Sequence, residues 1–131
     1  MELIPAFAAG LAYFLLGGFW FTPLFGKQWD DAVGFEHPTK WRPSAEYYIV
    51  PLLGCLAAAF ATDYLATLAH AQSLAEFLRV GFAAGLGYGA AITTVNAVAP
   101  NMRRPMKYAA VVGSYHLLGL SLCSAVLYWL S

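Results

Sequence analysis

Four long apolar stretches make up most of this chain, and only one of them contains a charged residue. A helix needs about 20 apolar residues to cross the hydrocarbon core of a bilayer, and each stretch reaches that length. Backbone polar groups in lipid have to be satisfied within the segment, which favours helices. The sequence therefore predicts an all-α, polytopic integral membrane protein. The predicted spans are residues 3–25, 47–68, 80–99 and 108–130.

Composition supports the same fold class and a single domain. Of the residues, 60% are hydrophobic and 11% are charged, whereas a soluble domain has about 25% charged residues. Short connections between the spans predict an antiparallel up-down-up-down bundle of four helices, one membrane domain over residues 1–131. The formal net charge is zero, so no basic footprint for nucleic acid is present. We expect membrane lipids as partners, and bound lipid in particular.

The first connection, residues 26–44, is long enough to have structure of its own. Phe25, Trp29, Ala32 and Val33 recur at helical spacing, and charged residues occupy the other faces. This pattern predicts a short helix that lies in the membrane interface. The acidic residues and the histidine of this connection lack a distinctive ligand spacing, so we predict no metal site.

Basic residues are distributed unevenly between the two ends of the predicted bundle. Six of the seven lie in or beside the first and third connections, and Arg79 alone lies at the other end. The positive-inside rule then places both termini on the non-cytoplasmic side of the cell (cytoplasmic) membrane. The predicted interface anchors are Lys27, Trp29, Trp41, Arg103 and Arg104.

Small residues mark the helix faces that should pack. Gly81, Gly85 and Gly89 recur every four residues in the third span, and the first span has Gly10 and Gly17. Helices in lipid associate by close backbone contact at such residues. We expect these faces to contact another helix, either in the same chain or in a neighbouring subunit. The second span has its own small face, made of Cys55, Ala59, Thr62 and Ala66.

Asp63 and Asn96 are two of the three polar candidates at membrane depth. A carboxylate in a span costs about 2.5–3.5 kcal/mol on insertion scales, so Asp63 should face the bundle interior. It either handles a proton or cation, or forms a hydrogen bond between helices. Asn96 continues the glycine face of the third span, where an interhelical hydrogen bond is the expected role.

His116, in the fourth span, is the third candidate. Three readings remain open for it: a packing histidine, a contact to a proton or polar substrate, or the ligand of a haem or chlorophyll. Thr93 or Thr94 lies at a similar depth and is the expected hydrogen-bond partner. The axial offset between His116 and Asp63 is about 12 Å at a rise of 1.5 Å per residue. They should therefore not pair directly.

One stretch resembles a known family. Residues 13–29 read Y-F-L-L-G-G-F-W-F-T-P-L-F-G-K-Q-W, which is similar to the first-helix signature of a bacterial four-helix membrane family, domain of unknown function 1761. The similarity extends over the chain through a glycine- and threonine-rich third span and Tyr115-His116-Leu117 in the fourth. The resemblance implies four spans and transfers no catalytic residue.

Three functions are compatible with these features. The preferred one is a small non-catalytic membrane protein that acts as an accessory or structural subunit, self-associated or within a larger complex. The alternative is a homo-oligomeric transporter or channel with Asp63, His116 and Asn96 along its pathway. The third is a cofactor-bearing protein that uses His116. The hydrolase-elbow, phosphate-loop and zinc motifs are absent from the sequence, so we predict no catalytic residues, and a non-enzyme is favoured.

Overall fold

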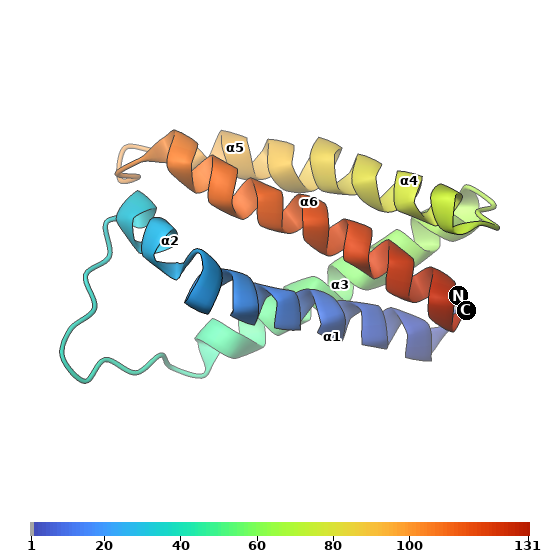
Figure 1. Ribbon diagram of the computed structural model, residues 1–131, viewed down its shortest axis with the longest axis horizontal. Helices are drawn as coiled ribbons and strands as arrows, with labels where there is room; N and C mark the ends of the chain where they lie inside the picture. The colour runs from blue at the N-terminus through green and yellow to red at the C-terminus, as the bar shows by residue number, and fades with distance from the viewer. Residues whose placement is uncertain (1) are drawn as a thin grey trace.

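The computed structural model describes residues 2–131, and they form an antiparallel bundle of four long helical segments (Figure 1). This arrangement confirms the predicted fold class. The first segment is α1 (Leu3–Phe19) with the π-helix η1 (Trp20–Leu24), followed by the short α2 (Gly26–Val33). The second is α3 (Glu46–Leu68). The third consists of α4 (Leu74–Ala84), the π-helix η2 (Gly85–Ala90) and α5 (Ala91–Ala97), and the fourth is α6 (Pro105–Leu130).

All four segments are long and apolar enough to cross a membrane, over Leu3–Leu24, Glu46–Leu68, Leu74–Ala97 and Pro105–Leu130. The protein is therefore a multi-pass membrane protein. The third helical segment begins at Leu74, before the expected residue 80, because Ser73 and Glu76 form a capping box at its start. The fourth begins at Pro105, a residue whose missing N–H costs nothing in a first turn.

Helix α6 is the central element of the bundle and lies between α1 and the α4–η2–α5 segment (Figure 1). Half of its span is buried, against 17% of the Leu74–Ala97 span. Leu127 and Cys123 of α6 are fully buried. Because α6 contacts every other helical segment, residues on its different faces can meet partners from α1, α3 and η2.

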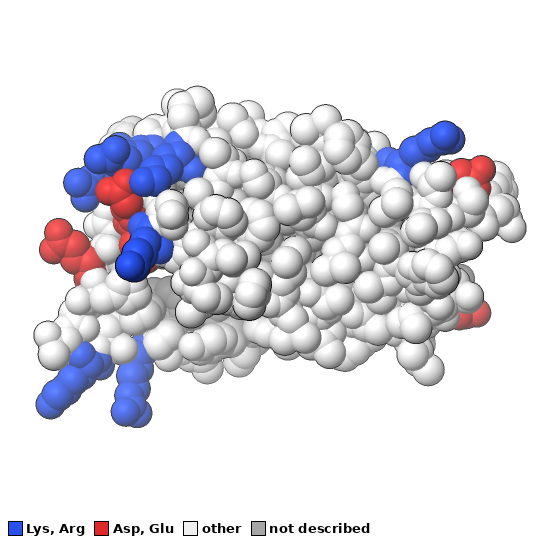
Figure 2. All heavy atoms as spheres, in the orientation of Figure 1, with Lys and Arg blue, Asp and Glu red and all other residues white. Residues whose placement is uncertain are grey.

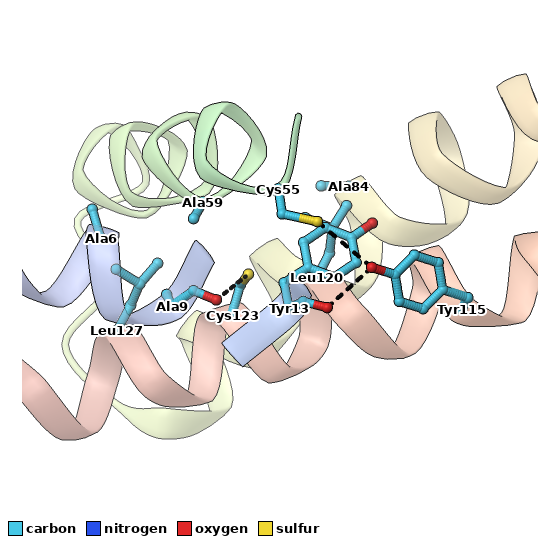
Figure 3. Packing of buried hydrophobic residues seen from close by; sticks show 10 residues of the cluster. All are labelled: Ala6, Ala9, Tyr13, Cys55, Ala59, Ala84, Tyr115, Leu120, Cys123 and Leu127. Atoms are coloured by element: carbon cyan, nitrogen blue, oxygen red, sulfur yellow. Dashed lines mark hydrogen bonds between the residues drawn. The ribbon is translucent and has the colours of Figure 1, made fainter. Parts of the chain in front are cut away.

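Small side chains allow the helices to approach closely in the core. Ala6 and Ala9 of α1, Ala59 of α3 and Cys123 of α6 all have no exposed surface (Figure 3). The thiol of Cys123 donates a hydrogen bond to the carbonyl oxygen of Ala9 at 3.3 Å. The predicted small face of α3 is confirmed, because each of its members is buried: Cys55, Ala59, Thr62 and Ala66.

The π-helix η2 changes which residues of the third span face the bundle. A π-turn holds more residues per turn than an α-helix, so the residues that follow it are rotated about the axis. Ala97 is fully buried after η2, whereas Ile92 and Asn96 are exposed. Among residues 2–131 no side-chain hydrogen bond involves Asn96. Among the described residues Asn96 therefore bridges no helices of this chain, because the rotation at η2 turns it outward, and a bridge to a neighbouring subunit stays a prediction.

The short helix expected in the first connection is present as α2. Its apolar face is directed inward, with Ala32 fully buried, and the backbone N–H of Arg104 donates to the carbonyl oxygen of Ala32 at 2.9 Å. The helix ends at Gly34, whose φ of 77° is a left-handed conformation that glycine adopts without strain. Helix α2 is thereby held against the start of α6.

The two ends of the bundle differ in charge. The chain termini lie side by side at one end, and α2 with the connections 34–45 and 98–104 lies at the other (Figure 1). Most Lys and Arg side chains in the view of Figure 2 gather at the α2 end. The charge asymmetry read from the sequence is thus a property of the folded molecule.

Candidate functional site

A cavity of about 930 Å³ lies between η1, α2, α6, the start of α3 and the connection that follows α2. Its wall is mainly apolar, and aromatic side chains dominate it. Apart from tyrosines, five polar or charged residues also line it: Thr22, Lys27, Asp30, His37 and His116. The aromatic residues include Phe21, Trp29, Phe35, Trp41, Tyr48 and Tyr108.

His116 is the cavity-lining residue that belongs to the middle of the bundle. It is half-buried on α6, and its Nδ1 atom is hydrogen-bonded to the hydroxyl of Tyr13, a buried residue of α1. The predicted partners were Thr93 and Thr94, but the hydroxyl of Thr94 donates to its own helix, at the carbonyl oxygen of Ala90. That expectation is wrong, because depth alone does not say which helix face a side chain occupies.

Tyr115, the neighbour of His116, extends this buried network. Its hydroxyl donates to the carbonyl oxygen of Tyr13 at 3.0 Å, and the Cys55 Sγ atom lies 3.6 Å from the same hydroxyl (Figure 3). The rings of Tyr13 and Tyr115 have centroids 5.1 Å apart, and Tyr115 lies 5.0 Å from the His116 ring. Trp20 of η1 makes a further hydrogen bond to α6, because its indole N–H donates to the carbonyl oxygen of Val111 at 3.0 Å. The network links α1, α3 and α6.

Each of the three central rings packs on a glycine of another element. A Cβ atom at Gly119 of α6 would overlap the ring of Tyr13, and one at Gly17 of α1 would lie 2.7 Å from the Tyr115 hydroxyl. A Cβ atom at Gly89 of η2 would lie 2.9 Å from the His116 Cβ atom. The rings can occupy these positions because the opposing residues lack side chains.

The remaining predicted glycines allow backbones to approach. Gly10 faces the backbone of Leu56, Gly85 faces that of Leu117, and Gly81 faces the Leu120 carbonyl, each at 2.5–2.9 Å from a Cβ atom added there. All five predicted glycines therefore contact another helix of the same chain. Gly119, Tyr13 and Tyr115 did not stand out as site residues in the sequence, because nothing in an apolar helix indicates which of its faces is turned to which neighbour.

The outer side of the cavity is formed by the connection after α2. Phe35, His37 and Trp41 pack against one another with ring centroids 4.7–5.1 Å apart, and Trp41 contacts Tyr47 of α3 at 5.9 Å. His37 Nε2 lies 2.7 Å from a carboxylate oxygen of Asp30. Trp41, expected as an interface anchor, is thus part of an aromatic cluster that covers the cavity.

Ion pairs attach α2 to α6 beside the cavity. Asp31 accepts a hydrogen bond from the ammonium group of Lys107 at 2.7 Å and lies 3.2 Å from the Arg104 guanidinium. The hydrogen bond from Lys107, assisted by the neighbouring arginines, holds the pKa of Asp31 below its ordinary value. Of the predicted anchors, Arg104 therefore has an intramolecular partner, and the side chain of Arg103 lies near Gly34.

Asp63 lies at the opposite end of the bundle, in a separate pocket of about 310 Å³. It is buried as expected, and Glu2, Thr67 and His70 line the same pocket. Its Oδ2 atom has no hydrogen-bond partner among residues 2–131. Asp63, His116 and Asn96 are therefore not brought together: two line different pockets and the third is exposed.

Comparison with known proteins gives one match. No curated protein and no solved structure matches the chain. Among residues 2–131, no group of three or more His, Cys, Asp or Glu side chains is arranged to hold a metal ion. The family model described as Protein of unknown function (DUF1761) matches residues 4–128, a range that covers nearly all of the four spans and every residue that lines the cavity. The chain therefore belongs to the DUF1761 family.

Proposed function

We propose that this protein is a non-catalytic membrane protein that binds an apolar or amphipathic molecule in the cavity beneath its first connection. The observation that supports this is the cavity itself, about 930 Å³, with a largely aromatic wall that includes the polar side chains of Tyr115 and His116 of α6. Ligand sites in proteins are concave, mainly apolar and contain a few polar groups that fix orientation. Membrane lipid is the most abundant source of such a molecule.

The surroundings of His116 support binding rather than catalysis. Its partner is a tyrosine hydroxyl that itself lies in a closed hydrogen-bonded network. Among the described residues, no carboxylate, thiol or serine hydroxyl is hydrogen-bonded to the His116 ring. A general base that activates a nucleophile needs such a neighbour within hydrogen-bond reach.

The protein acts, on this proposal, as a subunit of a membrane assembly, with itself or with other proteins. The supporting observation is a set of three glycines that face outward, Gly18 of α1, Gly54 of α3 and Gly87 of η2, where an added Cβ atom would meet nothing within 4 Å. Outward glycines in spans favour close contact with a further helix. A Gly87→Leu change should lower the stoichiometry seen by native mass spectrometry, whereas Leu11→Phe on the outer face of α1 should leave it unchanged.

Transport through a single chain is less favoured by the geometry. The pockets of Asp63 and His116 lie at opposite ends of the bundle, and the small-residue core fills the space between them. A pathway that used both groups would have to run between chains. Transport therefore stays the second candidate, and it requires a homo-oligomer.

The bound molecule is tested by native mass spectrometry of the protein after mild solubilisation. The wild-type protein should retain an apolar molecule. Val112 lines the cavity, so Val112→Phe should reduce its occupancy, whereas Leu118→Phe, on an exposed part of the same helix, should not. A wild-type protein without any bound molecule, or equal occupancy in both variants, would contradict the proposal.

A further inference from the structure

The imidazole of His116 has one nitrogen bound and one nitrogen free. Nδ1 is hydrogen-bonded to Tyr13, and no group among residues 2–131 is hydrogen-bonded to Nε2. Tyr13 is 3% exposed and covers the Nδ1 edge of the ring. His116 nevertheless lines the cavity. With Nδ1 bound to Tyr13, Nε2 is the ring nitrogen left for a ligand in the cavity.

The hydrogen bond to Tyr13 favours one tautomer of His116, the one in which the hydroxyl donates and Nδ1 accepts. Within the described residues, the Tyr13 hydroxyl has one acceptor in reach, Nδ1 of His116. The Tyr115 hydroxyl donates to the Tyr13 backbone carbonyl, and among the described residues no hydrogen bond joins the two tyrosine hydroxyls. A neutral imidazole has one donor and one acceptor nitrogen. With Nδ1 accepting from Tyr13, Nε2 has the proton and presents an N–H donor to the cavity.

An N–H donor in an apolar cavity favours a ligand with an acceptor. An unsatisfied donor in apolar surroundings is unfavourable, and a hydrogen bond there is stronger than in water. The one lysine or arginine in the cavity lining, Lys27, belongs to α2 at the end of the molecule where the first connection lies. An anionic group beside His116 would therefore be buried without a counter-charge, so a neutral acceptor fits better.

A carbonyl oxygen is the neutral acceptor that fits these surroundings. A ligand hydroxyl would also bring a donor, and the carbonyl oxygens of Tyr13 and Val111 already accept from Tyr115 and Trp20. We propose that the cavity binds an elongated apolar molecule whose carbonyl oxygen accepts a hydrogen bond from Nε2 of His116. This inference rests on the proposed function of the cavity and specifies its ligand.

Tyr13 is the positioning residue in this site. Its hydroxyl holds the imidazole through Nδ1 and keeps the proton on Nε2, and its ring is placed by Gly119. Two membrane molecules supply the carbonyl: the ester of an acylglycerol and the ring of a quinone. Both have an apolar chain for the aromatic wall.

The test uses two probes on the purified full-length protein in detergent, monoolein and a benzoquinone with a decyl chain, each ¹³C-labelled at the carbonyl. Affinity is measured from the fluorescence of the tryptophans, of which Trp29 and Trp41 line the cavity. Difference infrared spectroscopy measures the carbonyl stretch, which moves to lower frequency on hydrogen bonding. At least one probe should bind with that shift, and which one binds identifies the source.

The variants separate the hydrogen bond from the cavity. His116→Phe should abolish the infrared shift and weaken binding about three- to tenfold, because a neutral hydrogen bond contributes that much. His116→Gln, which keeps a side-chain N–H, should restore part of the shift. Leu118→Phe, on an exposed part of the same helix and outside the cavity lining, should leave it unchanged. In ¹⁵N NMR, neutral His116 should have its proton on Nε2 in the wild type. In Tyr13→Phe it should be a mixture of the Nδ1–H and Nε2–H tautomers.

Two failures are distinguishable. If neither probe binds the wild-type protein, the proposed function of the cavity is wrong. If a probe binds and its carbonyl band is the same in the wild type and in His116→Phe, the cavity binds a ligand but the hydrogen bond from His116 is overturned.

Discussion

At the scale of single residues, the arrangement of rings against glycines explains how polar groups are held inside an apolar bundle. Tyr13, Tyr115 and His116 contact glycines of neighbouring helices and hydrogen-bond among themselves or to backbone. Small residues in lipid permit close contact, and hydrogen bonds between helices add to it. The same glycines thus serve both packing and the candidate site.

Gly17 and Gly18 provide a matched test of this arrangement. Gly17→Ala should destabilise the protein by about 1–3 kcal/mol, the usual cost of overpacking, because its Cβ atom would lie 2.7 Å from the hydroxyl of Tyr115. Gly18→Ala enters open space and should change stability by less than about 0.5 kcal/mol. Thermal unfolding in detergent measures both. Equal effects of the two substitutions would show that Tyr115 does not require Gly17.

The sequence predicted the burial of single polar residues better than their partners. Asp63 was expected to face the bundle interior, and it is buried. The partner of His116 was not predicted, because Tyr13 lies 103 positions away and on a different helix. Residues at equal depth are equally plausible partners until the rotation of each helix about its axis is known.

At the scale of elements, α2 is the segment whose attachment depends on charge. Asp31 contacts both Lys107 and Arg104 of the α6 end, and the backbone hydrogen bond between Arg104 and Ala32 is the other polar link. These contacts hold α2 beside the cavity. An amphipathic helix of eight residues is too short to be stable alone, so its place depends on tertiary contacts.

The Asp31 contacts predict a pH dependence. Hydrogen bonding to Lys107 lowers the pKa of Asp31 in the folded protein, so its stabilising effect is present above the unfolded value of about 3.9 and is lost as pH falls below it. Hydrogen exchange of α2 should therefore accelerate in acid. Asp31→Asn should accelerate it already at pH 7, whereas Glu36→Gln, on an exposed residue, should not. Slow exchange in Asp31→Asn at pH 7 would contradict the ion-pair account.

The third span shows how one element can alter a sequence pattern. The spacing of four residues from Gly81 to Gly89 correctly predicted the face that contacts α6. The pattern did not extend to Asn96, because η2 contains π-turns. Hydropathy does not reveal a π-turn, since all residues around it are apolar or small.

At the scale of the whole molecule, the asymmetry of the two ends predicts an orientation. The basic α2 end should face the cytoplasm, and the termini should face the opposite side. Cysteines introduced as Ser131→Cys and Thr39→Cys test this in intact cells with a membrane-impermeant maleimide. The native cysteines are free and buried and should stay unreacted. Labelling of Ser131→Cys but not Thr39→Cys is expected, and the reverse would invert the orientation.

The sequence by itself determined the class of this protein, its four spans, its short interfacial helix and the charge difference between its ends. These follow from length, hydropathy and charge, because these properties decide which segments are stable in lipid and which stay in water. Only the tertiary structure decided that Tyr13 bonds His116, that each central ring packs on a glycine, and that a cavity lies beside them. Such features depend on helix rotation and tilt. In spans that are apolar on every side, hydropathy does not specify either.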